Sequence, residues 1–344
     1  MATYRAGVVG VGSRTVHGPA WARTLAEMPN VRLVRLSDDE EEAAEQTARS
    51  LGVEHFGTDP RAVLEAPDVD VVCVNSVDHE HAWQVITALE AGKHVVADKP
   101  LALGTTDLLR IASLVKRTGL KVAVGHVFRF APQYVFLKER VQSGELGELF
   151  LVEAGYVHDL RNVWKRTPWR ADQALPQNPW YGCTLHPIDL VHWLAGEITE
   201  VCAVENKATL PTEHPLPDNQ ICLLKLASGA VGRVWSSAGI RQRPEFQTFC
   251  NAFGSRGSCL ANLPRNTVEL HLDWGVQGVD GPQLVPFHSL SLNRALLDDW
   301  ITAIDEDAAP RSGVAEAVRS TAVIEAAMRS VTTCRFEATE VAEA

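Results

Sequence analysis

The chain has 344 residues, 46% of them hydrophobic and 22% charged, a profile typical of a soluble globular protein with room for two domains. Its net charge of -11 is spread along the chain, which argues against a nucleic-acid partner because such partners need a basic face. No apolar run reaches the roughly 18 residues of a membrane span, and the N-terminus lacks the pattern of a signal peptide. Seven scattered cysteines without metal-ligand spacing indicate free thiols in a reducing compartment, so we expect a cytoplasmic protein with no membrane partner.

In the first third of the chain, short apolar strands alternate with amphipathic helices. The strands are expected at 4–11, 31–38, 69–76, 93–98 and 120–126. The helices are expected at 17–28, 39–52, 59–66, 79–92 and 105–119. This alternation predicts a parallel sheet covered by helices on both faces.

After about Gly125 the pattern changes to one helix at 132–149 followed by longer strands. Strands are expected at 150–158, 200–209, 219–239, 246–262 and 267–272, and turn residues at 228–229 and 255–257 divide the two longest into hairpins. Two more helices are expected at 292–304 and 314–331. We therefore expect one domain over residues 1–125 and a second over residues 126–344.

Gly10 and Gly12 follow the first strand and precede a helix, as in the fingerprint of a dinucleotide-binding Rossmann domain. Glycine at both positions lets the backbone approach a pyrophosphate, and the helix start offers free N–H groups and a partial positive charge. Thr15 occupies the third glycine position of the fingerprint. The third glycine allows close packing of helix on strand, so its absence weakens that packing and not phosphate binding. The pattern predicts that the loop with Ser13 and Arg14 binds a nicotinamide dinucleotide.

Asp38 ends the second strand, where a carboxylate can accept hydrogen bonds from both ribose hydroxyls of the adenosine half. A carboxylate there repels a 2′-phosphate, which favours NAD over NADP. Arg14 and Arg35 could accommodate a phosphate, so NADP stays open. Asp38 is equally well placed to cap the helix that follows it.

Three segments resemble the glucose–fructose oxidoreductase, inositol dehydrogenase and MocA (Gfo/Idh/MocA) family. They are "GVVGVGSRTVH" at 7–17, "HAWQVITALEAGKHVVADKPLA" at 81–102 and "LHPIDLVHWLAG" at 185–196, within a resemblance that runs from about Tyr4 to Cys334. It implies an NAD(P)-dependent oxidoreductase with an α/β fold, a Rossmann domain followed by an α+β domain on a large open, mostly antiparallel sheet. An open apolar sheet face needs cover, so we expect a homodimer or homotetramer.

Within this resemblance, Lys99 matches the active-site lysine of the family, in a turn that reads Asp-Lys-Pro where the family usually has Glu-Lys-Pro. A cis bond before Pro100 is implied. His186 matches the catalytic histidine, a base with a pKa near neutrality that can take a hydroxyl proton while hydride leaves for nicotinamide. The positions expected to contact the cofactor are Asn75, Ser76, His81, Asp98 and Lys99.

Position 182 departs from the family. Many of its dehydrogenases have an aspartate four residues before the histidine, and this chain has Gly182, with Asp189, Tyr181 and Asp159 as candidate replacements. The departure leaves open a redox-neutral enzyme, in which transient oxidation of a sugar enables epimerisation or glycoside cleavage. A non-catalytic nicotinamide-binding sensor is the third alternative, and the presence of both Lys99 and His186 speaks against it.

Residues 158–183 show no helical or strand period and are predicted to form a long functional loop. Tryptophan faces pack against sugar C–H groups and arginines donate hydrogen bonds to hydroxyls or carboxylates, although a solvated loop anchored by tryptophans has the same composition. We expect a secondary alcohol, or the matching ketone, of a sugar, cyclitol, sugar acid or glycoside as substrate. His158, Asp159 and His186 could be considered as metal ligands, but the chain lacks two histidines at an HxxxH-type spacing. We therefore expect no metal. The candidate substrate contacts are Arg129, His158, Arg161, Trp164, Arg166, Trp169, Arg170, Tyr181 and Asp189.

Overall fold

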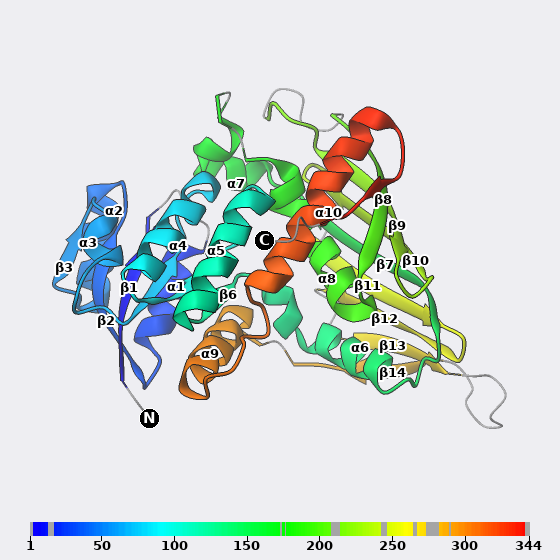
Figure 1. Cartoon of the computed structure of the whole chain (residues 1–344), viewed down its shortest axis with the longest axis horizontal. Coiled ribbons are helices and arrows are strands. Elements are labelled where there is room, and N and C mark those ends of the chain that lie inside the picture. The colour runs from blue at the N-terminus through cyan, green and yellow to red at the C-terminus, as the bar shows by residue number, and fades with distance from the viewer. Residues whose placement is uncertain are drawn as a thin grey trace.

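Two β-sheets, each with helices packed on it, organise the structure, a computed structural model of the chain (Figure 1). It describes residues 3–12, 17–172, 174–175, 177–207, 214–241, 246–263, 267–272, 282–288 and 290–340. The first sheet is formed by the N-terminal third of the chain and the second by the remainder.

The first sheet has six strands within the described residues, all parallel, in the order β3-β2-β1-β4-β5-β6. The strands are β1 (Tyr4–Val9), β2 (Val31–Ser37), β3 (His55–Gly57), β4 (Val71–Val74), β5 (His94–Ala97) and β6 (Val122–Val124). The helices between them are α1 (Gly18–Ala26), α2 (Glu41–Leu51), α3 (Arg61–Leu64), α4 (His81–Glu90) and α5 (Thr105–Thr118). This strand order is that of a Rossmann domain and confirms the predicted fold, while the short edge strand β3 had no sequence prediction.

The second sheet is mixed but mostly antiparallel, as predicted, because only β7 and β10 among its described strand pairs run parallel. Its order is β14-β13-β12-β11-β7-β10-β9-β8-β15. The predicted hairpins are present as the β9–β10 and β11–β12 pairs. The strands are β7 (Leu149–His158), β8 (Ile198–Asn206), β9 (Asn219–Leu226), β10 (Val231–Ser237), β11 (Phe246–Gly254), β12 (Gly257–Leu263), β13 (Thr267–Leu272), β14 (Gln283–Pro286) and β15 (Glu337–Ala338).

Helices cover one face of this sheet, namely α6 (Pro132–Gln142), α8 (Leu185–Ala195) and α10 (Val314–Thr333) (Figure 1). On the other face, side chains alternate outward along β9, where Ile221 and Leu223 are 47% and 51% exposed. Val204, opposite Ile221 in the ladder, is 61% exposed, and Val231 on β10 is 51% exposed. Apolar side chains therefore lie uncovered on what we call the open face.

The C-terminal helices return toward the first sheet. Helix α9 (Leu292–Asp305) buries Leu296 and Trp300 in one core cluster with Trp21 of α1, and α10 contacts both α5 and β8. The predicted division at residue 125 stays a prediction, since segments after it complete the core of the first sheet.

Residues 158–183 are more regular than expected. The described part of this segment contains the short helix α7 (Arg161–Arg166), a 3-10 turn at Pro168–Ala171 and the start of a π-helical turn at Trp180–Thr184 that leads directly into α8. The prediction of a structureless loop was wrong, because helices of one or two turns are too short to show a hydrophobic period.

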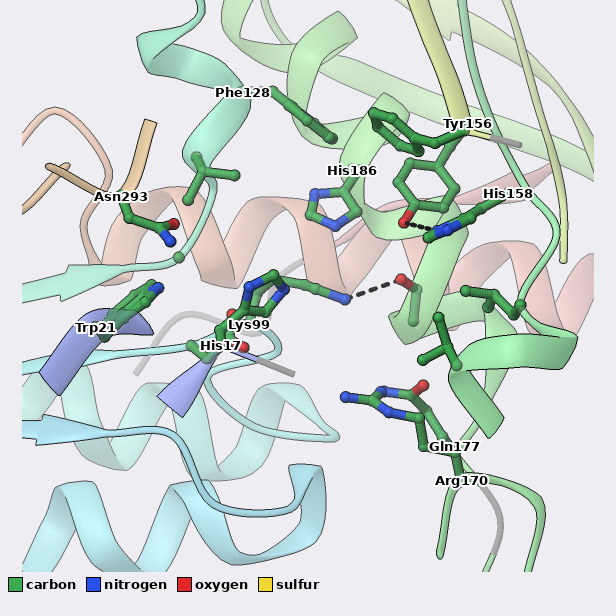
Figure 2. Close-up of a pocket in the computed structure, with 17 residues that line it drawn as sticks. His17, Trp21, Lys99, Phe128, Tyr156, His158, Arg170, Gln177, His186 and Asn293 are labelled. Carbon is green, nitrogen blue, oxygen red and sulfur yellow. Dashed lines mark hydrogen bonds between the residues drawn. The ribbon is translucent and has the colours of Figure 1, made fainter. Parts of the chain in front are cut away.

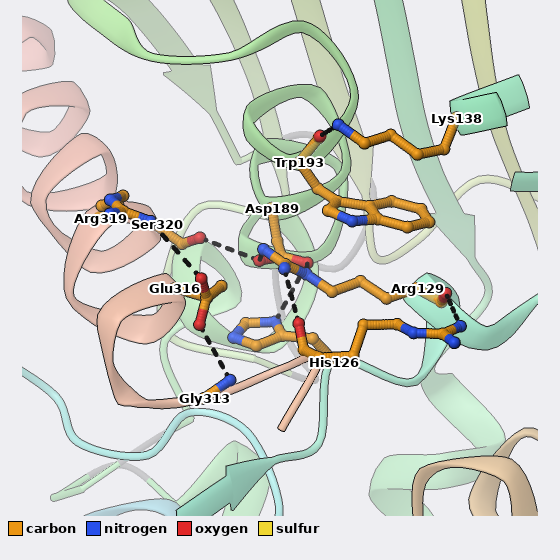
Figure 3. Close-up of polar contacts among 10 residues, drawn as sticks. His126, Arg129, Lys138, Asp189, Trp193, Gly313, Glu316, Arg319 and Ser320 are labelled. Atoms are coloured by element: carbon orange, nitrogen blue, oxygen red, sulfur yellow. Dashed lines mark hydrogen bonds and ion pairs between the residues drawn. The ribbon is translucent and has the colours of Figure 1, made fainter. Parts of the chain in front are cut away.

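A buried ion pair joins three elements of the second half (Figure 3). The Nε and Nη2 atoms of Arg129 donate to both carboxylate oxygens of Asp189, at 2.9 and 2.8 Å, and the hydroxyl of Ser320 on α10 donates to Asp189 Oδ1 at 3.2 Å. Burial alone raises the pKa of Asp189, but Arg129 and His126 outweigh it and bring that pKa below its usual value. Arg129 and Asp189, predicted as substrate contacts, are instead paired with each other in the interior.

Replacing Asp189 by Asn should lower the free energy of unfolding by about 3–5 kcal/mol, because Arg129 would keep a buried charge without its partner. The change is measured by urea unfolding. Glu200→Gln, which breaks the exposed 2.8 Å pair with Lys225, is the control and should cost about 0–1 kcal/mol. Equal losses in the two variants would contradict a structural role for the Arg129–Asp189 pair.

Candidate active site

The carboxyl ends of β5 and β6 meet the second sheet at a cavity of about 280 Å³ (Figure 2). Open α/β sheets bind ligands outside the carboxyl ends of their strands, so this is the expected place for a site. The first half of the chain contributes His17, Trp21, Asp98 and Lys99 to its wall. The second half contributes Tyr156, His158, Arg170, Gln177 and His186.

Lys99 reaches this cavity from the turn after β5. The carboxylate of Asp98 accepts a hydrogen bond from the Lys99 backbone N–H at 2.8 Å, and the Lys99–Pro100 peptide is cis, as the resemblance implied. The ammonium donates to the carbonyl oxygen of Gly182 at 2.9 Å (Figure 2). It also donates to the carbonyl oxygen of Tyr181 at 3.4 Å. Lys99 therefore bridges the two halves of the chain inside the cavity.

His186 lies in the first turn of α8 and is 7% exposed. Its ring stacks on Tyr156 with centroids 5.1 Å apart and lies 4.8 Å from the ring of Phe128. Burial, and then the charges of Lys99, His126 and His17, hold the pKa of His186 well below its usual value. The sequence predicted a pKa near neutrality, and the apolar surroundings and nearby cations account for the difference. The imidazole is thus neutral at neutral pH and can accept a proton.

Gln177 occupies the space next to Gly182. A Cβ atom at position 182 would lie 3.2 Å from the carboxamide carbon and oxygen of Gln177, so an aspartate there would require Gln177 to move. Gln177 is fixed, because its Nε2 donates to the carboxylate of Asp78 at 2.7 Å. A neutral amide therefore stands where the family resemblance implied a carboxylate.

The three candidate replacements for that carboxylate do not line the cavity. Asp189 pairs with Arg129, and Asp159 forms an ion pair with Arg161. The hydroxyl of Tyr181 donates to the carbonyl of Leu103 at 2.9 Å.

Of the predicted substrate contacts, His158 and Arg170 line the cavity. Trp164 stacks on His214 with centroids 4.4 Å apart, and Trp169 lies under the Arg170 guanidinium, so both tryptophans act as buried anchors. Arg161 is turned toward Asp159, and Arg166 is exposed outside the cavity. The alternative of tryptophans that anchor a basic segment thus fits Trp164 and Arg166.

A second cavity of about 310 Å³ lies at the carboxyl ends of β1, β2 and β4, with Gly10, Asp38 and Ser76 in its wall. Gly10 has φ +83°, and a Cβ atom there would lie 2.5 Å from the carbonyl of Asn75, so only glycine fits. The backbone N–H of Gly12 donates to Asp38 Oδ2 at 2.6 Å, and the other Asp38 oxygen accepts from the Glu40 N–H. Gly10 and Asp38 thus meet in the wall of the second cavity.

Two of the expected cofactor positions lie behind the cavity walls. The ring nitrogens of His81 contact the carbonyls of Pro100 at 2.7 Å and Ser76 at 2.9 Å, which ties the end of β4 to the Lys99 turn. Asn75 is buried, and its amide donates to the sulfur of Cys73. The predicted contacts Ser13 and Arg14 lie outside the described residues.

Sequence reasoning missed several cavity residues. Tyr156 precedes His158 by two positions on β7, so the strand period alone could have placed them on one face. His17 directly precedes α1. Gln177 and Asn293 belong to no sequence motif that would indicate a place in the cavity.

No described helix is long and apolar enough to cross a membrane. Over the same ranges, no three His, Cys, Asp or Glu side chains are grouped to hold a metal ion. All seven cysteines are free thiols, as predicted.

The chain is similar to known oxidoreductases over most of its length. Residues 4–126 match the model of an oxidoreductase family with an NAD-binding Rossmann fold, and residues 134–260 match the GFO/IDH/MocA C-terminal domain. Myo-inositol 2-dehydrogenase of Thermotoga maritima is 30% identical over 288 residues, 80% of each chain. Inositol 2-dehydrogenase 1 of Saccharopolyspora erythraea is 29% identical over 332 residues, 95% of this chain and 94% of the relative.

Among solved structures, a levoglucosan dehydrogenase in complex with NADH and L-sorbose superposes with a TM-score of 0.90 at 22% identity, covering 99% of this chain and 100% of that one. The superposition shows a shared fold. Together with the two family models and the Thermotoga maritima relative, it completes the assignment: the chain belongs to the Gfo/Idh/MocA family of oxidoreductases, with an NAD-binding Rossmann fold in its N-terminal part.

Proposed function

We propose that this enzyme oxidises a secondary alcohol of a sugar-like molecule, or reduces the matching ketone, with NAD. The observation that carries the proposal is the meeting of Lys99 and His186 in one cavity at the carboxyl edge of the parallel sheet. The names of the relatives, inositol and levoglucosan dehydrogenases, support a sugar or cyclitol substrate.

The two cavities fit the two halves of NAD. The adenosine half would lie against Gly10 and Asp38, where the carboxylate favours NAD over a 2′-phosphorylated cofactor. The nicotinamide would lie beside Lys99. When bound, NAD supplies the hydride acceptor of the oxidation.

The two catalytic residues would share the substrate hydroxyl. His186, neutral because of its lowered pKa, accepts the hydroxyl proton. Lys99 donates a hydrogen bond to the same oxygen and stabilises the negative charge that develops there as the proton leaves. Its ammonium has three N–H donors, so it can do this while keeping its contact with the Gly182 carbonyl.

Lys99→Met and His186→Gln should each lower kcat by about 10²- to 10⁴-fold, because each removes a group that handles the proton. Binding of NADH, followed by its fluorescence, should persist in both variants. Lys116→Met, at an exposed position of α5, is the matched control and should retain full activity.

The assay follows the near-ultraviolet absorbance of reduced nicotinamide with sugars, cyclitols, sugar acids and glycosides. Full activity in either active-site variant would contradict the assigned roles. Conversion of a glycoside or epimer without net nicotinamide reduction would instead identify the redox-neutral alternative.

The His186 ring should titrate below pH 6.5 in the folded protein, because burial and nearby cations favour its neutral form. The neutral base therefore persists as the pH falls through 6.5, and it is lost only at more acidic pH. In Lys99→Met the removal of one cation should raise this pKa. Histidine ring signals in NMR, assigned with His186→Gln, measure both values, and titration of His186 at or above pH 6.5 would contradict the proposed environment.

We also propose that two copies of the chain associate through the open face, which exposes Val204, Ile221, Leu223 and Val231. Exposed apolar side chains gathered on one face of a sheet favour association. Leu223→Lys should lower the mass measured by light scattering, whereas Phe56→Lys on the first sheet, 41% exposed, should not. A monomeric native protein, or an unchanged mass in Leu223→Lys, would contradict the interface.

A further inference from the structure

The cavity around Lys99 has more positive than negative charge in its wall. Among its described lining residues the cationic side chains are Lys99 and Arg170, and the one carboxylate is that of Asp98. Asp98 already accepts a hydrogen bond from the Lys99 backbone.

Arg170 is held in place without an acidic partner. Its backbone N–H donates to Thr167 and its carbonyl accepts from the Gln177 N–H at 2.9 Å, while the guanidinium lies 4.7 Å from the centre of the Trp169 ring. No described carboxylate pairs with it, and its Nε atom is buried without a hydrogen-bond partner in the described structure. Figure 2 shows the side chain extending into the cavity on the side opposite Phe128. A guanidinium that stacks on a tryptophan and has no described carboxylate partner is suited to a planar anion.

The cavity wall next to Arg170 is formed by Gln177 and Gly182, which are neutral. A carboxylate in their place would repel a bound anion. Gln177 fills the space beside Gly182, and its Nε2 is committed to Asp78 at 2.7 Å. Lys99 contacts the backbone carbonyl of residue 182, so an aspartate at that position would place a carboxylate close to the lysine. This chain has Gly182 and the neutral amide of Gln177 in that place. Neither supplies a negative charge to balance Lys99 and Arg170.

Resting on the proposed function, we propose that the substrate is a sugar acid, whose carboxylate binds Arg170 while its secondary hydroxyl lies between Lys99 and His186. A guanidinium can take a carboxylate through two parallel N–H···O bonds, which fixes the orientation of the sugar as well as binding it. The oxidised nicotinamide ring is itself cationic, so its presence makes an anionic substrate still more favourable. A neutral sugar or cyclitol would leave the Arg170 donors without a charged partner.

The test compares substrates that share one ring and differ in the group at C6, which is charged only in the acid. They are D-galacturonate, its methyl ester and D-galactose, with D-glucuronate, its methyl ester and D-glucose as a second series, assayed by nicotinamide reduction. The acids should have kcat/KM values about 10- to 100-fold above those of their esters and neutral sugars, the range expected for a charge-assisted hydrogen bond. A KM for the acids that rises with salt would accompany this preference.

Arg170→Gln should lower kcat/KM for the acid by about 10- to 100-fold and that for the neutral sugar by much less, whereas Arg170→Lys should retain part of the preference. Lys165→Gln removes an exposed cation of α7 outside the cavity and is the control for a general charge effect. Esters or neutral sugars that match the acids in the native enzyme, or equal losses on both classes in Arg170→Gln, would overturn the assignment.

The comparison of acids with their esters uses the native enzyme. It therefore tests the preference for a sugar acid even if Arg170→Gln fails to fold. Turnover of neutral sugars alone would overturn the sugar-acid assignment and leave the proposed function intact. If the wider panel of sugars, cyclitols, sugar acids and glycosides also leaves the nicotinamide absorbance unchanged, the proposed function fails as well.

Discussion

The hydrogen bond from Lys99 to the carbonyl of Gly182 is the contact on which the active site depends. It joins the turn after β5 to the π-helical turn before α8, and so sets the distance between the lysine and His186. The bond from Gln177 to Asp78 crosses between the same two halves of the chain. Single π-helical turns often mark functional sites, because the extra residue redirects the backbone carbonyls that follow the turn. Here those carbonyls hold an ammonium ready to be shared with a hydroxyl.

The buried Arg129–Asp189 pair supports this site from behind. It fixes α8 against the turn that follows β6 and against α10, and α8 in turn carries His186. Since α10 also contacts α5 and β8, the histidine is held by elements of both halves. The lowered pKa of His186 follows from the same construction, because a ring packed between Tyr156 and Phe128 loses the water that would stabilise its charged form.

Much of the fold could be predicted from local pattern, and parts of the site could not. The alternation of strands and helices predicted the parallel sheet, and the motifs around Lys99 and His186 predicted two residues that the structure brings to one cavity. Arg129 and Asp189 were misplaced because they are 60 positions apart, and a sequence does not say which opposite charges will meet. Gln177 was missed because its role depends on the missing side chain of Gly182, a relation visible only in space.

The central claim is that Lys99 and His186 act on one substrate hydroxyl beside the nicotinamide. A crystal structure of the enzyme with NADH and a bound sugar acid tests it most directly. We predict that the Lys99 ammonium and a ring nitrogen of His186 both lie within hydrogen-bond distance of the hydroxyl on the carbon that faces nicotinamide C4. A complex in which that carbon faces the nicotinamide while either side chain is turned away from its hydroxyl would contradict the account.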